Sequence, residues 1–530
     1  MDTSQTLLQI IFLDFSQQLK KYFCDKLFQM AKYLILITIF FVSKTSKGQE
    51  LSRTFYPSQL KEEISVLKEA LTTLHPGLYK YNTKQQIERL FNDLNSKISK
   101  PLNEKDFYLL LAKFTEKIGC GHTYLNPLNL EENIPALYMP EKVLPFCFVV
   151  VDRKFIITHN LSPDTTLKKG TEITKINGFT TSQIVDSLLQ VSRADGKNAI
   201  GKKLTNIELT PEQVNKYNLT DIFLPLFFKS VKDKFTIETK SIENKISIAK
   251  INGISTAQRG SIYKKRYGIV PKGENSLKIQ MLNDSTCYFK VGTFSFFGEE
   301  NPFTKIIDSL FLSLANYKKV KNLILDLRTN EGGSTDARNS LLKYILPKDF
   351  EAKEYQERPF YSFLEVPKRL IPFLNTWDDS FFDPKPDSIF KKNEFGFYED
   401  QSVESKNNKN FEDFKINANS FKGNTFLMTS PVNSSAAFEF AWVFKQYKAG
   451  KIVGEKTGGT KQGLNGGRFF FLRLPYSRIE IDLPFIYQAH IGQPDEGVSP
   501  AYNVTATQQD IYNGKDTQLD FVLKLIDGKK

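Results

Sequence analysis

The run NLILDLR at residues 322–328 constrains the fold more than any other stretch. It is almost continuously apolar, whereas a strand with one face in water alternates apolar and polar residues. Helical patterns lie on either side of it, at 302–317 and, after a Gly-Gly turn, at 336–346. This alternation predicts an α/β fold built on a mainly parallel sheet. Asp326 and Arg328 are expected to orient the turn through a salt bridge.

The alternation returns near the carboxyl end, where an apolar run at 425–428 is followed by a helical pattern that contains Phe438 and Trp442. Two serines stand at this junction. A hydroxyl placed there is exposed beside the free N–H groups of the first helical turn. We therefore predict Ser435 as a nucleophile, with Ser434 as the alternative if the register differs by one residue. A plain N-cap serine is the competing interpretation.

Two other features have chemistry that fits a nucleophile. Gly332 and Gly333 follow the carboxyl end of the apolar strand, where open α/β sheets place ligands, and their N–H groups can bond an oxyanion together with that of Ala436. His122 lies in the segment GCGHT at 119–123, in which glycines permit a tight loop. Nucleophile, base and anion hole are the minimum for acyl transfer.

The amino-terminal half predicts two smaller units. Apolar residues at helical spacing in 58–74, 87–98 and 107–118 predict a small helical domain. A strand ending in Asn-Gly within 169–178, followed by a helical pattern, predicts a PDZ-like module, with a plain β-domain as the alternative. The lysine-rich stretch at 199–270 is expected to hold mixed strands.

Residues 33–42 form an apolar run that is preceded by a lysine and followed by small and polar residues. The run is too short to span a bilayer but suits a signal peptide, with Met30 as the start and cleavage before Gln49. This predicts export to a periplasmic or secreted location. An uncleaved anchor, which would associate the protein with a membrane, is the alternative.

The formal charge of +13 comes from lysines and arginines that are interleaved with acids along the chain, so no nucleic-acid partner is predicted. The four histidines form no HExxH pattern, and the four cysteines are too widely spaced for a metal cluster. We therefore expect neither a metal nor an organic cofactor. A single disulfide is compatible with export but is not expected.

Several segments together resemble the tail-specific, or carboxyl-terminal processing, serine proteases (serine peptidase family 41). They are NLILDLRTNEGG at 322–333, Ser435 to Glu439, VGE at 453–455 with TGG at 457–459, HPG at 75–77, GHT at 121–123, the strand at 170–178 and EGVSP at 496–500. The resemblance implies a crotonase-like (ClpP-like) ββα core beside a PDZ-like domain. The expected divisions are a signal peptide with upstream extension at 1–48, a helical domain at 49–130, a PDZ-like domain and β-rich linker at 131–275, and the core at 276–530 with an insertion at 350–423.

The resemblance leaves two candidates for the base. Family members with a Ser-Lys dyad carry the lysine where this chain has Thr460, and Lys461 stands one position later. The branch that resembles the tricorn core protease uses serine, histidine and a distant glutamate instead, which His122 and Glu496 match. We expect Ser435, His122 and Glu496 to be catalytic, with Lys461 as the alternative base.

The predicted function is therefore that of an exported serine endopeptidase acting on peptides or on unfolded and carboxyl-terminal protein segments. The alternative is a non-catalytic protein of the same fold that binds a peptide or a hydrophobic ligand, as the similarity to retinoid-binding-protein repeats allows. The two differ in whether Ser435 reacts covalently with a serine-directed probe.

Overall fold

The computed structural model describes residues 53–127, 139–196, 199–229, 233–298, 302–351, 357–402 and 413–528. The expected leader at 1–48 lies outside these residues, so cleavage, anchoring and export stay predictions. Within the described ranges, no helix combines the length and the apolar character needed to cross a membrane.

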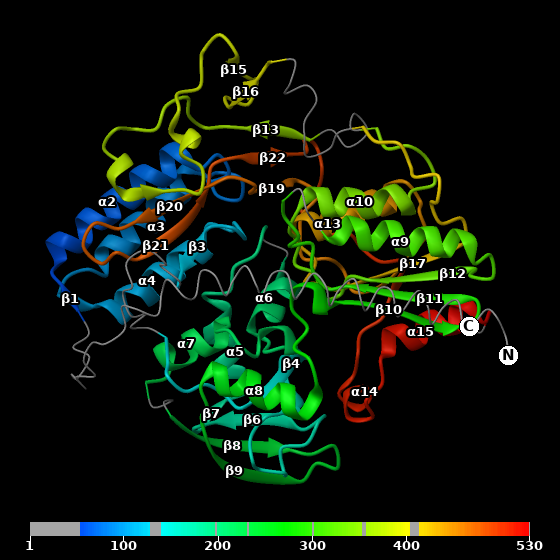
Figure 1. Ribbon diagram of the computed structural model, residues 1–530. Coiled ribbons are helices and arrows are strands. Elements are labelled where there is room, and N and C mark those ends of the chain that lie inside the picture. Colours follow the sequence, from blue (N-terminus) through cyan, green and yellow to red (C-terminus); the bar gives the residue numbers. More distant parts are fainter. Residues whose placement is uncertain are drawn as a thin grey trace, which may run out of the picture.

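The central sheet has the strand order β10-β11-β12-β17-β18-β23 (Figure 1). Its strands are β10 (Leu277–Asn283), β11 (Thr286–Val291), β12 (Asn322–Asp326), β17 (Asn424–Thr429), β18 (Lys451–Gly454) and β23 (Tyr502–Asn503). Neighbours from β11 to β23 are parallel, and β10 is an antiparallel edge strand. The prediction of a mainly parallel sheet is confirmed.

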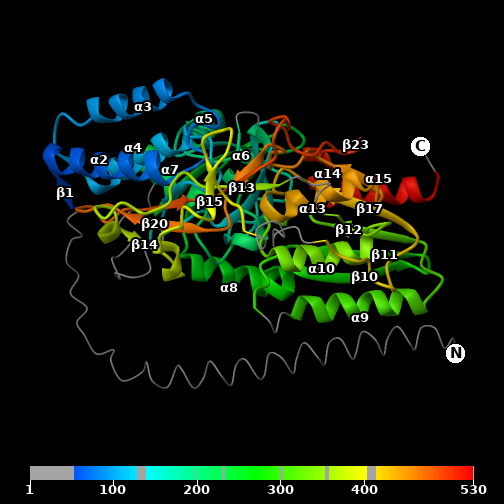
Figure 2. The same cartoon turned by 90° about the horizontal axis from the view of Figure 1, so that it is seen from above.

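Helices cover both faces of this sheet (Figures 1 and 2). One face packs against α9 (Pro302–Asn316), α10 (Thr335–Ile345) and α13 (Ser435–Gln446), and the other against α15 (Thr517–Ile526). Leu323 and Leu325 of β12 belong to the first core, whereas Ile324 packs with Val522 in the second. Because side chains of a strand alternate between faces, a strand buried on both sides has to be apolar at nearly every position.

A second sheet, in the order β14-β20-β21-β3, combines a strand from the amino-terminal part of the chain with strands from its carboxyl-terminal half. Its strands are β14 (Leu374–Asn375), β20 (Phe469–Arg473), β21 (Glu480–Pro484) and β3 (Tyr124–Asn126). It packs beside α2 (Pro57–Leu74), α3 (Lys84–Ser96) and α4 (Glu104–Glu116), which confirm the predicted amino-terminal helices (Figure 1). The helices share one hydrophobic core with β20 and β21. The expected domain boundaries remain predictions.

The middle of the chain forms an antiparallel sheet of β4 (Phe146–Val151), β5 (Lys154–Asn160), β6 (Glu172–Ile176), β8 (Lys234–Lys240) and β9 (Ile246–Asn252). The predicted turn after β6 is present: Asn177 and Gly178 have φ angles of 49° and 87°, and β7 (Phe179–Thr180) returns along β6. The helix after it, α5 (Thr181–Leu189), was also expected.

The expectation of mixed strands at 199–270 is wrong in part. The segment contains β8 and β9 but also α6 (Ile200–Ile207), α7 (Leu219–Phe227) and α8 (Thr256–Tyr267). Helix α6 spans only eight residues and fully buries one of them, Ile207, so its apolar period is too short to stand out in the sequence, and Pro225 inside α7 is a residue that usually ends helices.

The insertion at 350–423 contributes short strands at its described positions. β13 (Arg358–Phe360) pairs with β22 (Tyr487–Ala489), which also pairs with β19 (Gly463–Asn465). β15 (Phe390–Lys392) and β16 (Tyr398–Asp400) form a hairpin, and β14 lies in the second sheet. The insertion is thus attached to the segment at 463–489.

Candidate active site

The loops that follow β12 and β17 meet at one edge of the central sheet, because these strands are parallel neighbours. We call residues 327–334 the oxyanion loop and residues 430–435 the nucleophile turn. A Cβ atom built on Gly332 would lie 2.9 Å from Cβ of Ser435 and 3.1 Å from the backbone N of Ala436. The structure therefore brings three of the predicted site residues into contact, and a side chain at Gly332 would displace the serine.

Buried polar groups fasten the nucleophile turn to the oxyanion loop. Asn433 is fully buried, accepts the N–H of Ser430 and donates to the carbonyl oxygens of Leu327 and Asn330, the latter at 3.0 Å. The Ser430 hydroxyl donates to the carbonyl of Arg328 at 2.6 Å. The bond between Ser430 and Asn433 shapes the turn itself, and the other three join it to the oxyanion loop, so the two segments are held together.

The two serines of the turn differ in conformation. Ser434 is the N-cap of α13, but its hydroxyl caps no N–H group and donates instead to the carbonyl of Glu331 at 3.0 Å. Ser435 has a φ angle of 49°, in the left-handed region that residues other than glycine rarely adopt. The competing interpretation therefore holds for the position of Ser434, which is the N-cap, but its hydroxyl does not cap the helix. A strained backbone at such a junction is typical of functional positions.

The predicted oxyanion donors are not equivalent. The N–H of Gly332 donates to Oδ1 of Asn330 at 2.8 Å and is therefore occupied. Within the described residues, no acceptor takes the N–H of Gly333 or of Ala436. Gly333 has a φ angle of 137°, and a Cβ there would lie 2.3 Å from the carbonyl carbon of Phe294, so only glycine fits.

His122 lies on the loop at 119–123, which is held by Asp195. The N–H of Gly121 donates to Oδ1 of Asp195 at 2.8 Å, and a Cβ on Gly121 would lie 2.7 Å from Oδ2. The same Oδ2 lies 4.0 Å from Nδ1 of His122, a buried nitrogen without a hydrogen-bond partner among the described residues. Burial lowers the pKa of His122, and the charge of Asp195 opposes that shift.

Lys202 of α6 connects the histidine electrostatically to the nucleophile turn. Its Nζ donates to the carbonyl of Val432 at 3.2 Å and lies 3.6 Å from the carboxylate of Glu331. Its positive charge also contributes to lowering the pKa of His122. The sequence offers no signal for this lysine, because it is one of many in a segment whose helix was not predicted.

Glu496 and Lys461 pair with each other. Nζ of Lys461 lies 2.7 Å from Oε1 of Glu496, and Lys456 approaches the other oxygen at 3.9 Å. The hydrogen bond from Lys461 lowers the pKa of Glu496, whose side chain is 40% exposed. In the described part of the chain, no hydrogen bond or ion pair joins Glu496 to His122. This pairing directs the amino group of Lys461 toward Glu496.

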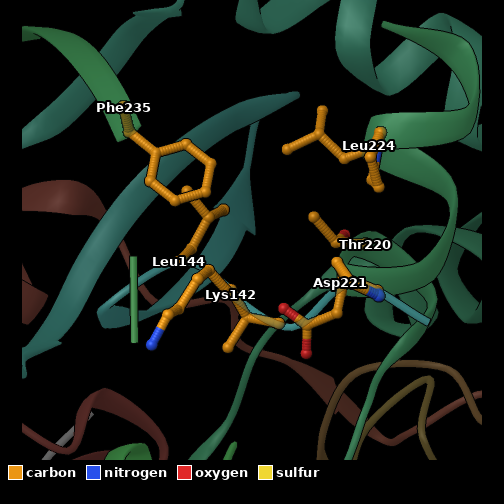
Figure 3. Close-up of a pocket in the computed structure, with 9 residues that line it drawn as sticks. Lys142, Leu144, Thr220, Asp221, Leu224 and Phe235 are labelled. Atoms are coloured by element: carbon orange, nitrogen blue, oxygen red, sulfur yellow. The ribbon is translucent and has the colours of Figure 1, made fainter. Parts of the chain in front are cut away.

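A small pocket in the middle segment is lined by residues of α7, β8 and the chain before β4 (Figure 3). Asp221 lines it, but its carboxylate is bound by Nη1 and Nη2 of the buried Arg259, at 3.0 Å and 2.8 Å. The other labelled side chains are Lys142, Leu144, Thr220, Leu224 and Phe235. The pocket thus contains none of the predicted catalytic residues, and its carboxylate has a structural partner.

Comparison with known proteins finds a family model that matches part of the chain and solved structures of similar fold. Residues 285–466 match the model of peptidase family S41. A comparison with curated protein sequences finds no match. Among solved structures, mature CPAF is 15% identical with a TM-score of 0.58, covering 89% of this chain and 98% of that chain. Mature CPAF complexed with lactacystin is 14% identical over the same shares, with a TM-score of 0.57. The likeness supports an α/β protease fold.

Proposed function

We propose that this chain, which belongs to peptidase family S41 and is a serine-type peptidase, cleaves peptides or unfolded protein segments with Ser435 as nucleophile and His122 as general base. One observation carries the assignment of the nucleophile: Ser435 has a left-handed backbone and lies against Gly332 at the start of α13. That position exposes a hydroxyl beside the unoccupied N–H of Ala436.

In the proposed reaction, Nε2 of His122 takes the proton of the Ser435 hydroxyl as Oγ attacks the scissile carbonyl carbon. The N–H groups of Gly333 and Ala436 bind the resulting oxyanion. His122 then gives its proton to the leaving amine, and the C–N bond breaks to leave an acyl-enzyme. Water attacks this ester while His122 accepts its proton. The bond from the acyl carbon to Oγ then breaks as His122 returns that proton to Oγ, which regenerates the serine and releases the carboxylic acid product.

The third member is proposed to be Asp195, in place of the expected Glu496. A carboxylate that orients the base has to face the imidazole nitrogen that does not meet serine. Oδ2 of Asp195 lies 4.0 Å from Nδ1 of His122, whereas the carboxylate of Glu496 is paired with Lys461. Catalytic hydrogen bonds are often long without substrate and shorten when it binds. We assign Glu496 to holding Lys461 near the site.

The finer architecture is also part of the proposal. The resemblance described above supports a crotonase-like core at 276–530 and a PDZ-like unit in the middle segment, whose antiparallel sheet packs with α5. A PDZ-like unit would bind substrate along an exposed sheet edge. Photocrosslinking of a substrate peptide to residues 139–270 tests this role, and crosslinks confined to the central sheet would argue against it.

The nucleophile is tested with a fluorophosphonate probe and the variants Ser435→Ala and Ser434→Ala. Ser435→Ala is expected to lose labelling and to reduce peptide hydrolysis by at least about a thousandfold, because a triad serine acts as a unit with its base. Ser434→Ala is the matched control and should keep both. Undiminished cleavage by Ser435→Ala contradicts the assignment. A folded wild-type protein that binds peptide without being labelled would instead support the non-catalytic alternative.

A further inference from the structure

Aromatic side chains form a continuous row that begins at His122. The ring of Phe469 lies 5.9 Å from that of His122, measured between centroids. Trp377 lies 5.5 Å from Phe469 and 5.4 Å from Phe471. We call Trp377, Phe469 and Phe471 the aromatic shelf. Phe381 supports it from behind, 6.5 Å from Trp377.

Strand geometry explains why these rings share one face. Along β20, Phe470 and Leu472 are fully buried in the core, whereas Phe469 and Phe471 are only partly buried, as expected for side chains that alternate between faces. Strand β14 is antiparallel to β20, and its Asn375 pairs with Phe471. The residues that follow Asn375 therefore run toward Phe469. The Thr376 hydroxyl donates to the carbonyl of Phe469 at 3.0 Å and fixes this register.

Unlike aromatic rings in a hydrophobic core, the outer ring of the shelf is exposed to solvent. Trp377 is 60% exposed, whereas Trp442, in helix α13, is 5% exposed. A single exposed apolar residue is ordinary, but a row of rings that leads to a catalytic side chain is a specific arrangement. Aromatic rings provide large apolar contact area with few torsions to restrict, which makes them effective binding surfaces.

We propose that the aromatic shelf binds a large apolar side chain of the substrate on the carboxyl-terminal side of the scissile bond. This rests on the proposed function, because the side of the scissile bond that meets the shelf follows from the proposed role of His122 as the base. The base that protonates the leaving amine lies next to the amine, so residues that follow the scissile bond pass it. Phe469 touches His122, and Trp377 extends the same surface by one more ring.

The kinetic test uses two peptides of otherwise identical sequence with Phe or Gly after the scissile bond, and a methyl ester that has no residue there. Trp377→Ala is expected to lower kcat/KM for the Phe peptide about tenfold, with little change for the Gly peptide and none for the ester. Trp377→Phe should retain most of the preference. Phe395→Ala removes another exposed ring of the insertion, which is 48% exposed, and should change nothing. An intact Phe preference in Trp377→Ala, or an equal loss on all three substrates, overturns the proposal.

A binding test separates this proposal from the catalytic one. The chain contains two tryptophans, of which Trp377 is exposed and Trp442 is buried. Titration of the inactive Ser435→Ala variant with the Phe peptide should shift tryptophan emission to shorter wavelength, at about tenfold lower concentration than with the Gly peptide. Trp377→Phe in the same background should abolish the shift. If the wild-type protein is neither labelled at Ser435 nor active on the ester, the catalytic proposal fails. The titration then still shows whether the aromatic shelf binds the Phe side chain. Equal emission shifts with the Phe and Gly peptides would refute the proposed binding of the Phe side chain by the shelf.

Discussion

His122 is surrounded by groups that act on its charge in opposite directions. Burial has the largest effect and lowers its pKa, Arg193 and Lys202 lower it further, and Asp195 raises it. A general base has to be unprotonated before it can accept the serine proton. The net lowering therefore keeps the imidazole neutral at physiological pH.

The pH dependence of the wild-type enzyme and of Asp195→Asn follows from this balance. The acid limb of kcat/KM should lie below pH 6.5, the ordinary value for histidine, because the His122 pKa is lowered. Asp195→Asn removes a negative charge that raises this pKa, so the limb should move to still lower pH. Loss of orientation should also reduce kcat by about tenfold or more, within the range of general-base catalysis. Steady-state pH profiles measure both effects. If Glu496→Gln moves the limb and Asp195→Asn does not, Glu496 is the orienting carboxylate.

Among the site residues, the sequence predicted those that stand in a recognisable local pattern. Ser435 was predicted from a strand-to-helix junction, Gly332 from a Gly-Gly turn and His122 from a glycine loop. Asp195 was not predicted, because the Asp-Gly pair at 195–196 is typical of any turn. Asp195 matters because its carboxylate accepts the N–H of Gly121, and these two residues are 74 positions apart in the sequence, so no local pattern shows the contact.

Helices α10 and α13 carry the oxyanion loop and the nucleophile at their first turns, and a buried ion pair joins them. Arg338 donates from Nη1 to Oε2 of Glu439, and both side chains are almost fully buried. Burial raises the pKa of Glu439, while the arginine opposes the shift. The pair fixes the two helices relative to each other, so it also fixes the relation between Ser435 and Gly333.

Breaking this pair from one side should be strongly destabilising. Arg338→Met leaves a buried carboxyl without its partner and is expected to cost about 3–5 kcal/mol in the free energy of unfolding. The double variant Arg338→Met/Glu439→Leu removes both charges and should recover much of that loss. Chemical denaturation measures the three proteins. A cost of less than about 1 kcal/mol for Arg338→Met would show that the pair does not hold the helices.

Elements with strong periodicity were predicted well, and the others were not. Helix α2 and strand β12 have clear apolar patterns, and the predicted salt bridge between Asp326 and Arg328 is confirmed at 2.7 Å. The sequence did not show that Arg328 also binds Asp516, at the start of α15, because that pairing depends on how distant elements pack. Helix α6 was missed because it spans only eight residues and fully buries one of them.

At the scale of the whole molecule, a buried carboxyl group of the middle segment is influenced by the charge of a carboxylate beside the central sheet. Glu208 ends α6 and accepts the N–H of Val150 at 2.9 Å. Burial raises its pKa to about 8, with a further contribution from Glu455, which follows β18. Folding therefore favours the protonated form of Glu208.

Stability should consequently fall as the pH rises. Between about pH 5 and pH 8 the folded protein holds a proton on Glu208 that the unfolded chain, with a pKa near 4.5, has lost. This group therefore lowers the free energy of unfolding by at most about 1.4 kcal/mol per pH unit. Glu208→Gln carries a neutral amide and should flatten that decline, as thermal unfolding across this pH range would show. An identical slope in the variant would contradict the assignment.

The pairing of β3 with β21 also has a consequence for biosynthesis. His122 lies just before β3, and Asn126 of that strand contacts Asp482, 356 residues further along the chain. Contacts of such separation form late, because a long loop has to close first. A ribosome therefore releases nearly the whole polypeptide before the proposed base, His122, and the proposed nucleophile, Ser435, can meet. The growing chain, which is itself an unfolded protein, is synthesised without an assembled site that could cut it.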